Sequence, residues 1–239
     1  MPALSPVQLG SDLRASATVF IASGDRSLAV GAFRQRHASR KAFDGFVAAN
    51  PLRAWEYAWV IQQIAKHGTG YGEAVDFGAG KSPIPILLAD LGYATSVVDS
   101  DQLDNEYANE WQWVDYGKWG IKTHKAGMED RIFDEAALSV AVSVSAIEHM
   151  AAETRRKAIE EITRAIKPQG LAVLTIDVMP DGIHLWNLVV DEIEPLGDHG
   201  TIDSFVSELE VGGLRLLRRA SCPLKGGQSL VEAFVLFKS

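Results

Sequence analysis

The stretch VDFGAGKSP (Val75–Pro83) joins two segments that differ in their hydrophobic pattern. Residues 73–75, which lead into this stretch, have the composition of a short buried strand. After it, apolar residues recur at i, i+3, i+4 and i+7, which is the pattern of one helix face, at Ile84, Leu87, Leu88 and Leu91. The sequence therefore predicts a strand-to-helix turn whose glycines let a ligand approach the free backbone N–H groups at the helix start.

The amino-acid sequence of this turn indicates which nucleotide-like ligand it can bind. A Walker loop requires glycine at the place of Val75, and a dinucleotide fingerprint requires a third glycine where Pro83 stands. Asp76 would repel a pyrophosphate, whereas it would attract a ligand that carries a positive amino group. The turn therefore favours S-adenosylmethionine.

The whole chain has the length and composition of an ordinary globular protein. Its 239 residues fit one α/β domain, with 47% hydrophobic and 23% charged residues. The net charge of −8 argues against a nucleic-acid partner, because such a surface is basic. A single cysteine, Cys222, and the lack of a long apolar segment predict a cytoplasmic protein without a membrane partner. The oligomeric state stays open.

Beyond the glycine turn, strand and helix patterns alternate. We expect helices over residues 151–167 and 201–210, and strands over residues 95–99, 121–124, 138–144, 171–177, 214–220 and 231–237. This alternation predicts a mostly parallel sheet. Because no helix separates the last two strands, they are expected to form an antiparallel edge.

The first 70 residues are predicted to form a separate helical segment. Tyr57, Val60, Ile61 and Ile64 are spaced as a helix stripe that ends near residues 67–68. Its place before the first strand predicts a lid over the ligand. The chain is therefore divided into a lid or cap, residues 1–70, and a ligand-binding domain, residues 71–239.

Five motifs in order resemble those of class I S-adenosylmethionine-dependent methyltransferases that act on small molecules. The likeness covers about residues 54–178, and the motifs are Asp76–Gly80, Val97–Asp99, Gly127–Asp130, Phe133–Asp134 with Val142–Met150, and Ile166–Leu171. Ser82 replaces the frequent third glycine of the first motif. The resemblance implies a Rossmann-like, doubly wound, mostly parallel seven-stranded sheet with an antiparallel C-terminal strand and an N-terminal helical lid.

The resemblance also implies where S-adenosylmethionine binds. Asp76 and the backbone of Gly78, Ala79 and Gly80 would hold the methionine moiety. Asp99, at the end of the second strand, can accept hydrogen bonds from both ribose hydroxyls, with Ser100 beside it. Met128 would pack on the adenine ring and Glu129 or Asp130 would reach its amino group. Ser143 would lie beneath the sulfonium.

Two of these assignments have structural alternatives. Asp99 can instead cap a helix over residues 101–110, and Glu129 and Asp130 can belong to a solvated loop or a helix start.

A base is needed only if the methyl acceptor must lose a proton. His149, which follows the strand at residues 138–144, is the candidate, although it also suits a structural role at the next helix start. His184 and Asp181 are second choices. No group of residues has the spacing of a metal site, and no metal is expected.

The predicted function is transfer of a methyl group from S-adenosylmethionine to an oxygen or nitrogen atom of a small molecule, such as a sugar or a secondary metabolite. The alternatives are a non-catalytic cofactor-binding or scaffolding module of the same fold, and an NAD-dependent oxidoreductase with a Rossmann fold. The acceptor pocket is expected to form from residues 1–70, 101–120 and 178–200.

Overall fold

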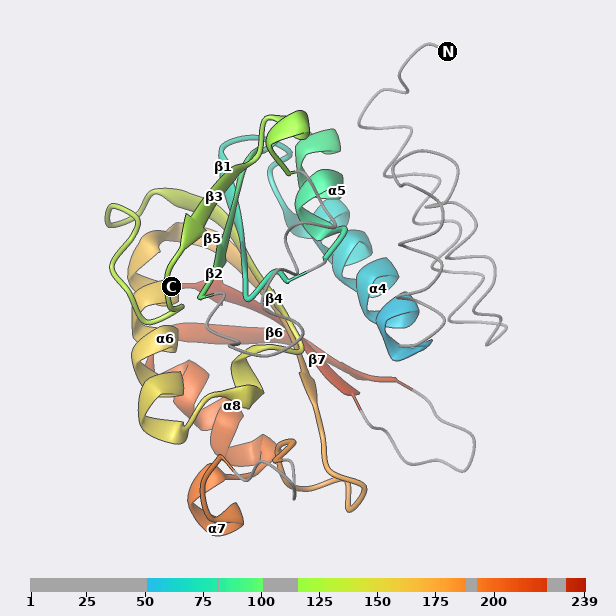
Figure 1. Cartoon of the computed structure of the whole chain (residues 1–239), viewed down its shortest axis with the longest axis vertical. Coiled ribbons are helices and arrows are strands. Elements are labelled where there is room, and N and C mark those ends of the chain that lie inside the picture. Colours follow the sequence, from blue (N-terminus) through green and yellow to red (C-terminus); the bar gives the residue numbers. More distant parts are fainter. Residues whose placement is uncertain (1–50, 81, 101–115, 188–192, 223–230) are drawn as a thin grey trace.

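The computed structural model describes residues 51–80, 82–100, 116–187, 193–222 and 231–239. They include a sheet whose seven strands lie in the order β3-β2-β1-β4-β5-β7-β6 (Figure 1). The strands are β1 (Glu73–Phe77), β2 (Ala94–Asp99), β3 (Lys122–Lys125), β4 (Leu138–Val144), β5 (Ile166–Asp177), β6 (Leu214–Ser221) and β7 (Val231–Lys238). The predicted Rossmann-like, doubly wound α/β fold is confirmed.

Strands β1 to β5 run parallel to one another, and β7 runs antiparallel to both of its neighbours. The predicted antiparallel pair at the sheet edge, formed by the last two strands, is therefore confirmed. β7 inserts between β5 and β6, and the edge strand is β6. The burial patterns fit this order, because β7 is mostly buried and largely apolar, whereas β6 is mostly exposed and carries charged residues, as an edge strand does.

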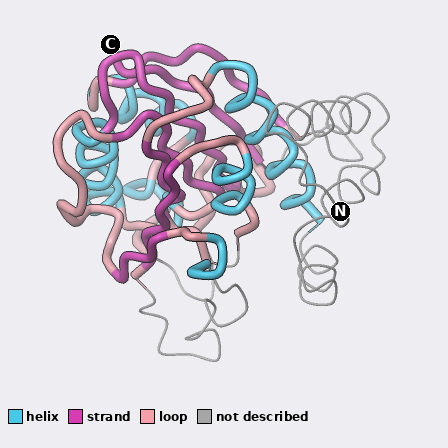
Figure 2. The backbone as a smooth tube through the Cα atoms, turned by 90° about the horizontal axis from the view of Figure 1, so that it is seen from above, coloured by secondary structure: helices cyan, strands magenta, loops and turns pink. Residues whose placement is uncertain are grey.

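Helices cover both faces of the sheet (Figures 1 and 2). Helices α4 (Pro51–His67) and α5 (Ile84–Asp90) pack on one face, where Val140 and Val142 of β4 point toward them. Helices α6 (Ala152–Ala165) and α8 (Ile202–Val211) pack on the other face, where Ala141 contacts their core. Successive residues of β4 thus face different cores, which explains why the whole strand is buried and mostly apolar.

Helix α4 belongs to this layered core. Trp59, Val60, Ile61 and Ile64 are almost fully buried in the same hydrophobic cluster as α5 and β4. The predicted helix at this position is thus present, and it packs on the sheet. The division at residue 70 stays a prediction, and residues 1–50, to which the lid hypothesis also refers, lie outside the described part of the chain.

The junction between α6 and β5 differs from the prediction. Helix α6 ends at Ala165, and β5 already begins at Ile166, before residues 168–170, which were expected to form a turn between the helix and the strand. That turn lies within the strand, where Gln169 has a φ of 62° and the register with β4 shifts between Leu138 and Val140. The irregularity is a bulge, which absorbs the extra residues without ending the strand.

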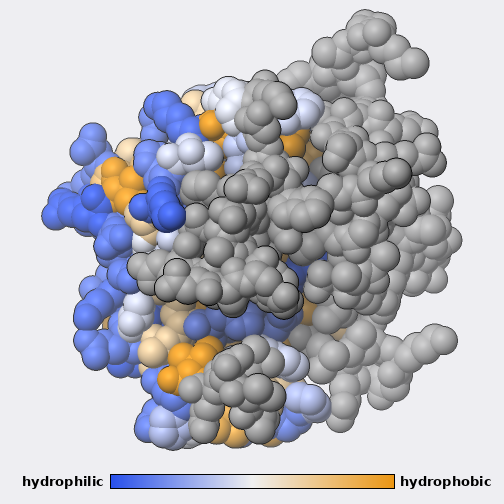
Figure 3. Space-filling view, viewed as in Figure 1, coloured by the Kyte–Doolittle hydropathy of each residue, from blue (hydrophilic) through white to orange (hydrophobic). Residues whose placement is uncertain are grey.

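The described surface in Figure 3 is mainly hydrophilic, with small hydrophobic patches. Within the described ranges, no helix combines the length and the apolar character that a membrane crossing requires.

Candidate active site

The glycine turn lies at the carboxyl end of β1, between the strand and α5. Gly78 and Gly80 have φ angles of 69° and 46°, a region that favours glycine. A Cβ atom on Gly78 would lie 2.5 Å from side-chain atoms of both Met128 and Ala146. The backbone N–H of Gly78 donates to the carbonyl oxygen of Val98 at 2.8 Å. The turn is therefore held against the end of β2 and has no room for a side chain at Gly78.

Asp99 ends β2 and faces this turn. Its Oδ2 atom accepts a hydrogen bond from the backbone N–H of Gly80 at 2.8 Å. This contact was not predicted, since Asp99 had been assigned either to a ribose or to a helix cap. The residues of that proposed helix, 101–110, lie outside the described part of the chain. Asp99 is half-buried, and Ser100 beside it is half-buried as well.

Tyr116 supports the turn from the other side. This residue begins the short 3-10 helix η2 (Tyr116–Trp119) and is almost fully buried. Its hydroxyl lies 2.8 Å from the carbonyl oxygen of Ser82 and 3.2 Å from that of Gly80. The Ser82 hydroxyl accepts from the N–H of Ile84, the first residue of α5, at 3.1 Å. Ser82 thus has a local structural use at the place of the third glycine.

Asp76 is the buried acid of the turn. Its side chain is 1% exposed, and neither carboxylate oxygen has a hydrogen-bond partner among the described residues. Burial raises the pKa of Asp76 to about 8, the charge of Asp99 adds to the rise, and the nearby Ser82 hydroxyl opposes it. A buried carboxyl group without a partner is costly, and a cationic ligand group would compensate it.

The loop after β3 lies next to the same turn. The N–H of Ala126 donates to the carbonyl oxygen of Asp99 at 3.0 Å, which joins this loop to the end of β2. Met128 is buried, and its methyl group lies against Gly78. Glu129 is exposed, whereas Asp130 accepts from the N–H of Gly127 at 2.8 Å and so shapes the loop. The structure thus brings Met128 to the turn and leaves Glu129 in solvent.

Ser143 is placed differently from the other predicted residues. It lies within β4, two residues after Ala141, and therefore on the same face of the sheet, the face covered by α6 and α8. It is fully buried. Its hydroxyl has no hydrogen-bond partner in the described part of the chain. Asp76 pairs with Val142 of β4 and so belongs to the opposite face of the sheet. A cofactor contact from Ser143 would therefore involve its backbone.

A second polar group gathers where β4 and β5 end. Ser145, just after β4, has a φ of 43°, which is unusual for a residue with a side chain. Its hydroxyl donates to Glu56 Oε1 at 2.6 Å, and the Thr175 hydroxyl donates to the same oxygen. Glu56 also forms an ion pair with Arg53 at 2.5 Å. The Arg53 guanidinium forms a second ion pair with Asp177 at 3.2 Å. Helix α4 thus supplies both a buried acid and its counterion to this end of the sheet.

His149, the predicted base, lies in this polar group. It ends the 3-10 helix η3 (Ile147–His149), and its Nε2 atom is 3.9 Å from Glu148 Oε1. Burial lowers the pKa of the His149 ring, although the charge of Asp177 opposes this. Burial, reinforced by Asp177, raises the pKa of Glu148 well above its usual range. His149 is therefore neutral near pH 7 and able to accept a proton.

The second-choice bases pair with each other in the loop after β5. His184 Nδ1 lies 2.6 Å from Asp181 Oδ2. The hydrogen bond from His184 lowers the pKa of Asp181 to about 2, assisted by the backbone N–H groups of Ile183 and His184. This arrangement stabilises a turn of the loop, and Asp181 is too acidic to serve as a base at neutral pH.

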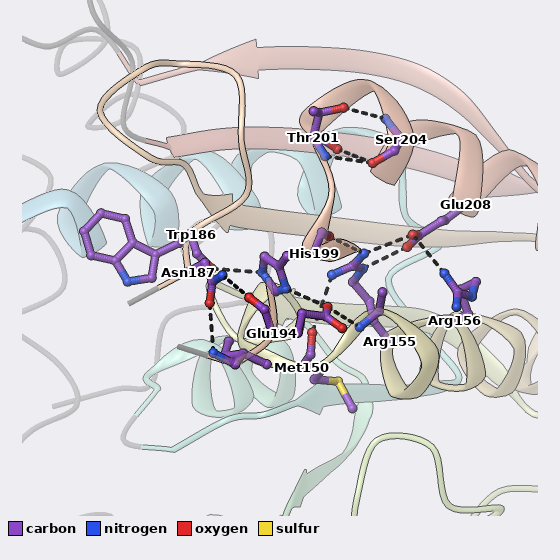
Figure 4. A network of polar contacts seen from close by, with 12 residues as sticks. Met150, Arg155, Arg156, Trp186, Asn187, Glu194, His199, Thr201, Ser204 and Glu208 are labelled. Carbon is purple, nitrogen blue, oxygen red and sulfur yellow. Dashed lines mark hydrogen bonds and ion pairs between the residues drawn. The ribbon is translucent and has the colours of Figure 1, made fainter. Parts of the chain in front are cut away.

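A buried network fastens the loop that follows β5 to the body of the domain (Figure 4). The His199 ring contacts Glu194 Oε1 at 2.9 Å and the carbonyl oxygen of Trp186 at 3.0 Å. The buried Arg155 guanidinium donates to the His199 carbonyl at 2.8 Å and forms two hydrogen bonds with Glu208. The half-buried Trp186 is thereby held on a fixed backbone.

Sequence reasoning missed several of these residues. Arg53, Glu56, Ser145 and Asp177 were not singled out, and Tyr116 was included only in the stretch 101–120 that was expected to help form the acceptor pocket. The spacing of Arg53 and Glu56 on a predicted helix, and the position of Asp177 at the end of a buried strand, were available signals. Nothing in the sequence indicated that α4 would bring its acid to the ends of β4 and β5.

Comparisons with known proteins agree with this geometry. Residues 75–174 match a family described as "Methyltransferase domain". No curated protein is significantly similar to the chain.

Solved structures share the fold at low sequence identity. The N-methyltransferase NodS from Bradyrhizobium japonicum, in complex with S-adenosylhomocysteine, is 12% identical with a TM-score of 0.60, covering 80% of this chain and 90% of that one. The 1,6-didemethyltoxoflavin-N1-methyltransferase of Burkholderia thailandensis, with its namesake compound and S-adenosylhomocysteine bound, is 14% identical with a TM-score of 0.58. It covers 100% of this chain and 92% of its own. A TehB-like methyltransferase from Corynebacterium glutamicum is 20% identical with a TM-score of 0.53, covering 77% and 88%.

Proposed function

We propose that this chain, whose residues 75–174 match a methyltransferase-domain family, is an S-adenosylmethionine-dependent methyltransferase that methylates an oxygen or nitrogen atom of a small-molecule acceptor. The observation that carries the proposal is the hydrogen bond between Asp99 and the N–H of Gly80, because it joins the turn after β1 to the carboxyl end of β2. Ligands of open α/β sheets bind at the carboxyl ends of the strands.

Two features of the chain fit S-adenosylmethionine. The orphaned carboxylate of Asp76 would compensate the ammonium group of the methionine moiety. The backbone at Gly78, Ala79 and Gly80, where a Cβ on Gly78 has no space, would lie along the same moiety.

The remaining cofactor contacts follow from the neighbouring loops. Asp99, with Ser100 beside it, would accept hydrogen bonds from the ribose hydroxyls. Met128 would contact the adenine ring from its place against the turn, with Glu129 reaching the amino group from solvent. Ser143 would contribute through its backbone at the end of β4.

Bound S-adenosylmethionine supplies a methyl carbon that is already activated by the sulfonium, so the protein mainly aligns the acceptor. His149 would take the proton of an acceptor that must lose one, because its ring is neutral at pH 7. Asp177 lies beside this ring and would stabilise the charge that it gains.

The acceptor class is proposed from the nature of the polar group and from related structures. The acceptor would lie near the ends of β4 and β5, where Arg53, Glu56 and Asp177 present polar atoms, with the loop that carries Trp186 beside it. Two of the similar structures are N-methyltransferases, which supports nitrogen as one of the two possible acceptor atoms. Sugars and secondary-metabolite scaffolds remain the proposed compound classes.

Incubating the protein with S-adenosylmethionine labelled in its methyl group and a panel of hydroxyl- and amine-bearing metabolites tests this function. We expect label in one acceptor class and an equal amount of S-adenosylhomocysteine. A protein that binds the cofactor, transfers no label and is isolated with a bound protein partner would contradict the proposal in favour of a non-catalytic module.

A further inference from the structure

We propose that Glu148, His149 and Asp177 bind a divalent transition-metal ion at the carboxyl ends of β4 and β5. Each of the three residues offers one ligand atom, and these atoms all lie within 4.8 Å of one another. The inference deepens the proposed function and rests on it, because such an ion would bind the methyl acceptor. It departs from the sequence-based expectation that no metal site is present.

Local structure holds the three side chains together. Glu148 and His149 lie on η3, and Asp177 is the last residue of β5. The backbone N–H of Asp177 donates to Glu148 Oε1 at 2.6 Å, and the Nε2 atom of His149 lies 3.9 Å from the same oxygen. Two ligands of one tetrahedral ion at about 2.1 Å are roughly 3.4 Å apart. The side chains therefore need only a small contraction to surround an ion.

An unsatisfied buried atom points to a missing ligand. The Glu148 side chain is fully buried, and its Oε2 atom has no hydrogen-bond partner among the described residues. A buried carboxylate oxygen without a partner is costly, because it has lost water and gained nothing in return. An ion coordinated by this carboxylate would remove that cost.

The surrounding charges favour a cation. The carboxyl groups of Glu56 and Asp177 bind one guanidinium, that of Arg53, and Glu148 lies close enough to feel its charge. Arg53 pairs with Glu56 as well as with Asp177, so its positive charge is already balanced. At Asp177 it contacts Oδ2, while Oδ1 accepts from the Ser145 hydroxyl at 3.2 Å. These contacts orient the Asp177 carboxylate as the outer partners of metal ligands do.

The ligand set indicates the class of ion. Two carboxylate oxygens and one imidazole nitrogen suit Mn²⁺, Co²⁺ or Zn²⁺ better than Mg²⁺ or Ca²⁺, which prefer oxygen ligands alone. Three protein ligands leave coordination positions open, as in catalytic metal sites. The His149 and Asp177 side chains are 39% and 20% exposed, so that a small acceptor can reach those positions.

The ion would activate a hydroxyl group of the acceptor for methylation. A hydroxyl bound to a divalent metal loses its proton more readily, and that proton passes to solvent. The resulting oxygen then forms a bond to the methyl carbon while the carbon–sulfur bond breaks. The His149 lone pair that binds the ion cannot also take a proton. In the metal-bound protein, His149 is thus a ligand and the ion replaces the base.

Cobalt titration of the whole chain, freed of metals with a chelator, tests the site. Co²⁺ has visible absorption bands whose intensity reports coordination by protein ligands. We expect one Co²⁺ per chain. Glu148→Gln and Asp177→Asn should each weaken Co²⁺ binding by more than about 100-fold, since even outer-shell changes cost 10- to 100-fold. Glu160→Gln, at an exposed position on α6, should bind as the wild type does.

Calorimetric titration of the same proteins with S-adenosylhomocysteine separates the two proposals and checks that each variant is folded. The metal site alone would be overturned if the wild type bound S-adenosylhomocysteine but took up no Co²⁺. It would also be overturned if the variants bound S-adenosylhomocysteine and bound Co²⁺ as tightly as the wild type. Uptake of alkylamines in place of Co²⁺ would also overturn it and assign the acids to a cationic acceptor. Failure of the wild type to bind S-adenosylhomocysteine would count against the proposed function.

Discussion

Asp99 at the end of β2 accepts a 2.8 Å hydrogen bond from the backbone N–H of Gly80, nineteen residues earlier in the chain. The same carboxylate that is proposed to hold a ribose therefore also shapes the turn that is proposed to hold the methionine moiety. The two roles are coupled, because loss of Asp99 removes a ligand contact and releases the turn.

Replacing Asp99 by alanine should weaken both cofactor binding and the fold. We expect S-adenosylhomocysteine to bind about 30- to 1000-fold less tightly, which corresponds to roughly 2–4 kcal/mol for two charge-assisted hydrogen bonds. The free energy of unfolding of the unliganded protein should fall by about 0.5–1.5 kcal/mol through loss of the bond to Gly80. Calorimetry and thermal unfolding of one variant measure both effects.

Asp99→Asn is the matched comparison, because an amide oxygen can still accept from the N–H of Gly80. It should keep the stability of the wild type and still lose most of the affinity. The exposed Asp134→Asn should change neither quantity. An Asp99→Ala protein that unfolds earlier and yet binds S-adenosylhomocysteine as before would place the ribose elsewhere.

Removing the Tyr116 hydroxyl should loosen the other side of the turn. Tyr116→Phe deletes the contact with the carbonyl oxygens of Ser82 and Gly80 and leaves the buried ring in place. We expect a loss of about 1 kcal/mol in the free energy of unfolding, or roughly 2–4 °C in Tm. Tyr71→Phe, at a position that is 67% exposed, is the control and should not shift Tm. Equal melting of all three proteins would show that this hydroxyl does not support the turn.

Asp76 should make the stability of the unliganded protein depend on pH. Its pKa rises from an ordinary 3.8 to about 8 on folding, first because it is buried. The folded state therefore favours the protonated carboxyl. Its contribution to stability is complete below about pH 3.8 and is lost as the pH rises through 8. In chemical unfolding between pH 5 and pH 8.5, Asp76→Asn should flatten this decline, and an unchanged slope would contradict the assignment.

The same residue should give ligand binding the opposite dependence on pH. The ammonium group of S-adenosylhomocysteine attracts an ionised Asp76, so affinity should increase as the pH approaches 8 from below. Calorimetric titrations at several pH values measure this increase. Asp76→Asn should bind weakly at every pH. If the affinity of the wild type stayed constant from pH 6 to pH 8, Asp76 would not form an ion pair with the ammonium group of the ligand.

The network behind the loop after β5 should contribute strongly to stability through Arg155. Its guanidinium is fully buried and bonded to Glu208 and to the His199 carbonyl. Arg155→Met should lower the free energy of unfolding by about 3–5 kcal/mol, since it leaves Glu208 without its buried partner. Arg156→Met is the matched control, because Arg156 is 55% exposed and 3.8 Å from the same acid. Its loss should cost less than about 1 kcal/mol. Similar unfolding curves for both variants would contradict this account.

Local patterns in the sequence predicted most of the helices and strands of the fold. The mostly apolar run from Leu138 to Val144 predicted β4 to the residue, because a central strand is buried on both faces and is therefore rich in apolar residues. The helix stripe ending near residue 67 likewise predicted α4. The position of β7 between β5 and β6 was missed, because the pairing of strands depends on which edges meet in three dimensions and not on their order along the chain.

The candidate site was predictable only where one motif contains all its parts. The turn from Asp76 to Gly80 is such a motif. Glu56 and Asp177 are 121 residues apart in the sequence, and only the packing of α4 on the sheet makes Arg53 a shared partner of both. Contacts of this kind have no local signature, so neither the acidic group nor the use of Asp99 by Gly80 was predicted.

The most direct measurement is a calorimetric titration of the whole chain with S-adenosylhomocysteine and, in parallel, with NAD⁺. The account predicts one molecule of S-adenosylhomocysteine bound per chain and no heat from NAD⁺, since Asp76 opposes a pyrophosphate and favours an ammonium group. Tight binding of NAD⁺ without any response to S-adenosylhomocysteine would contradict it.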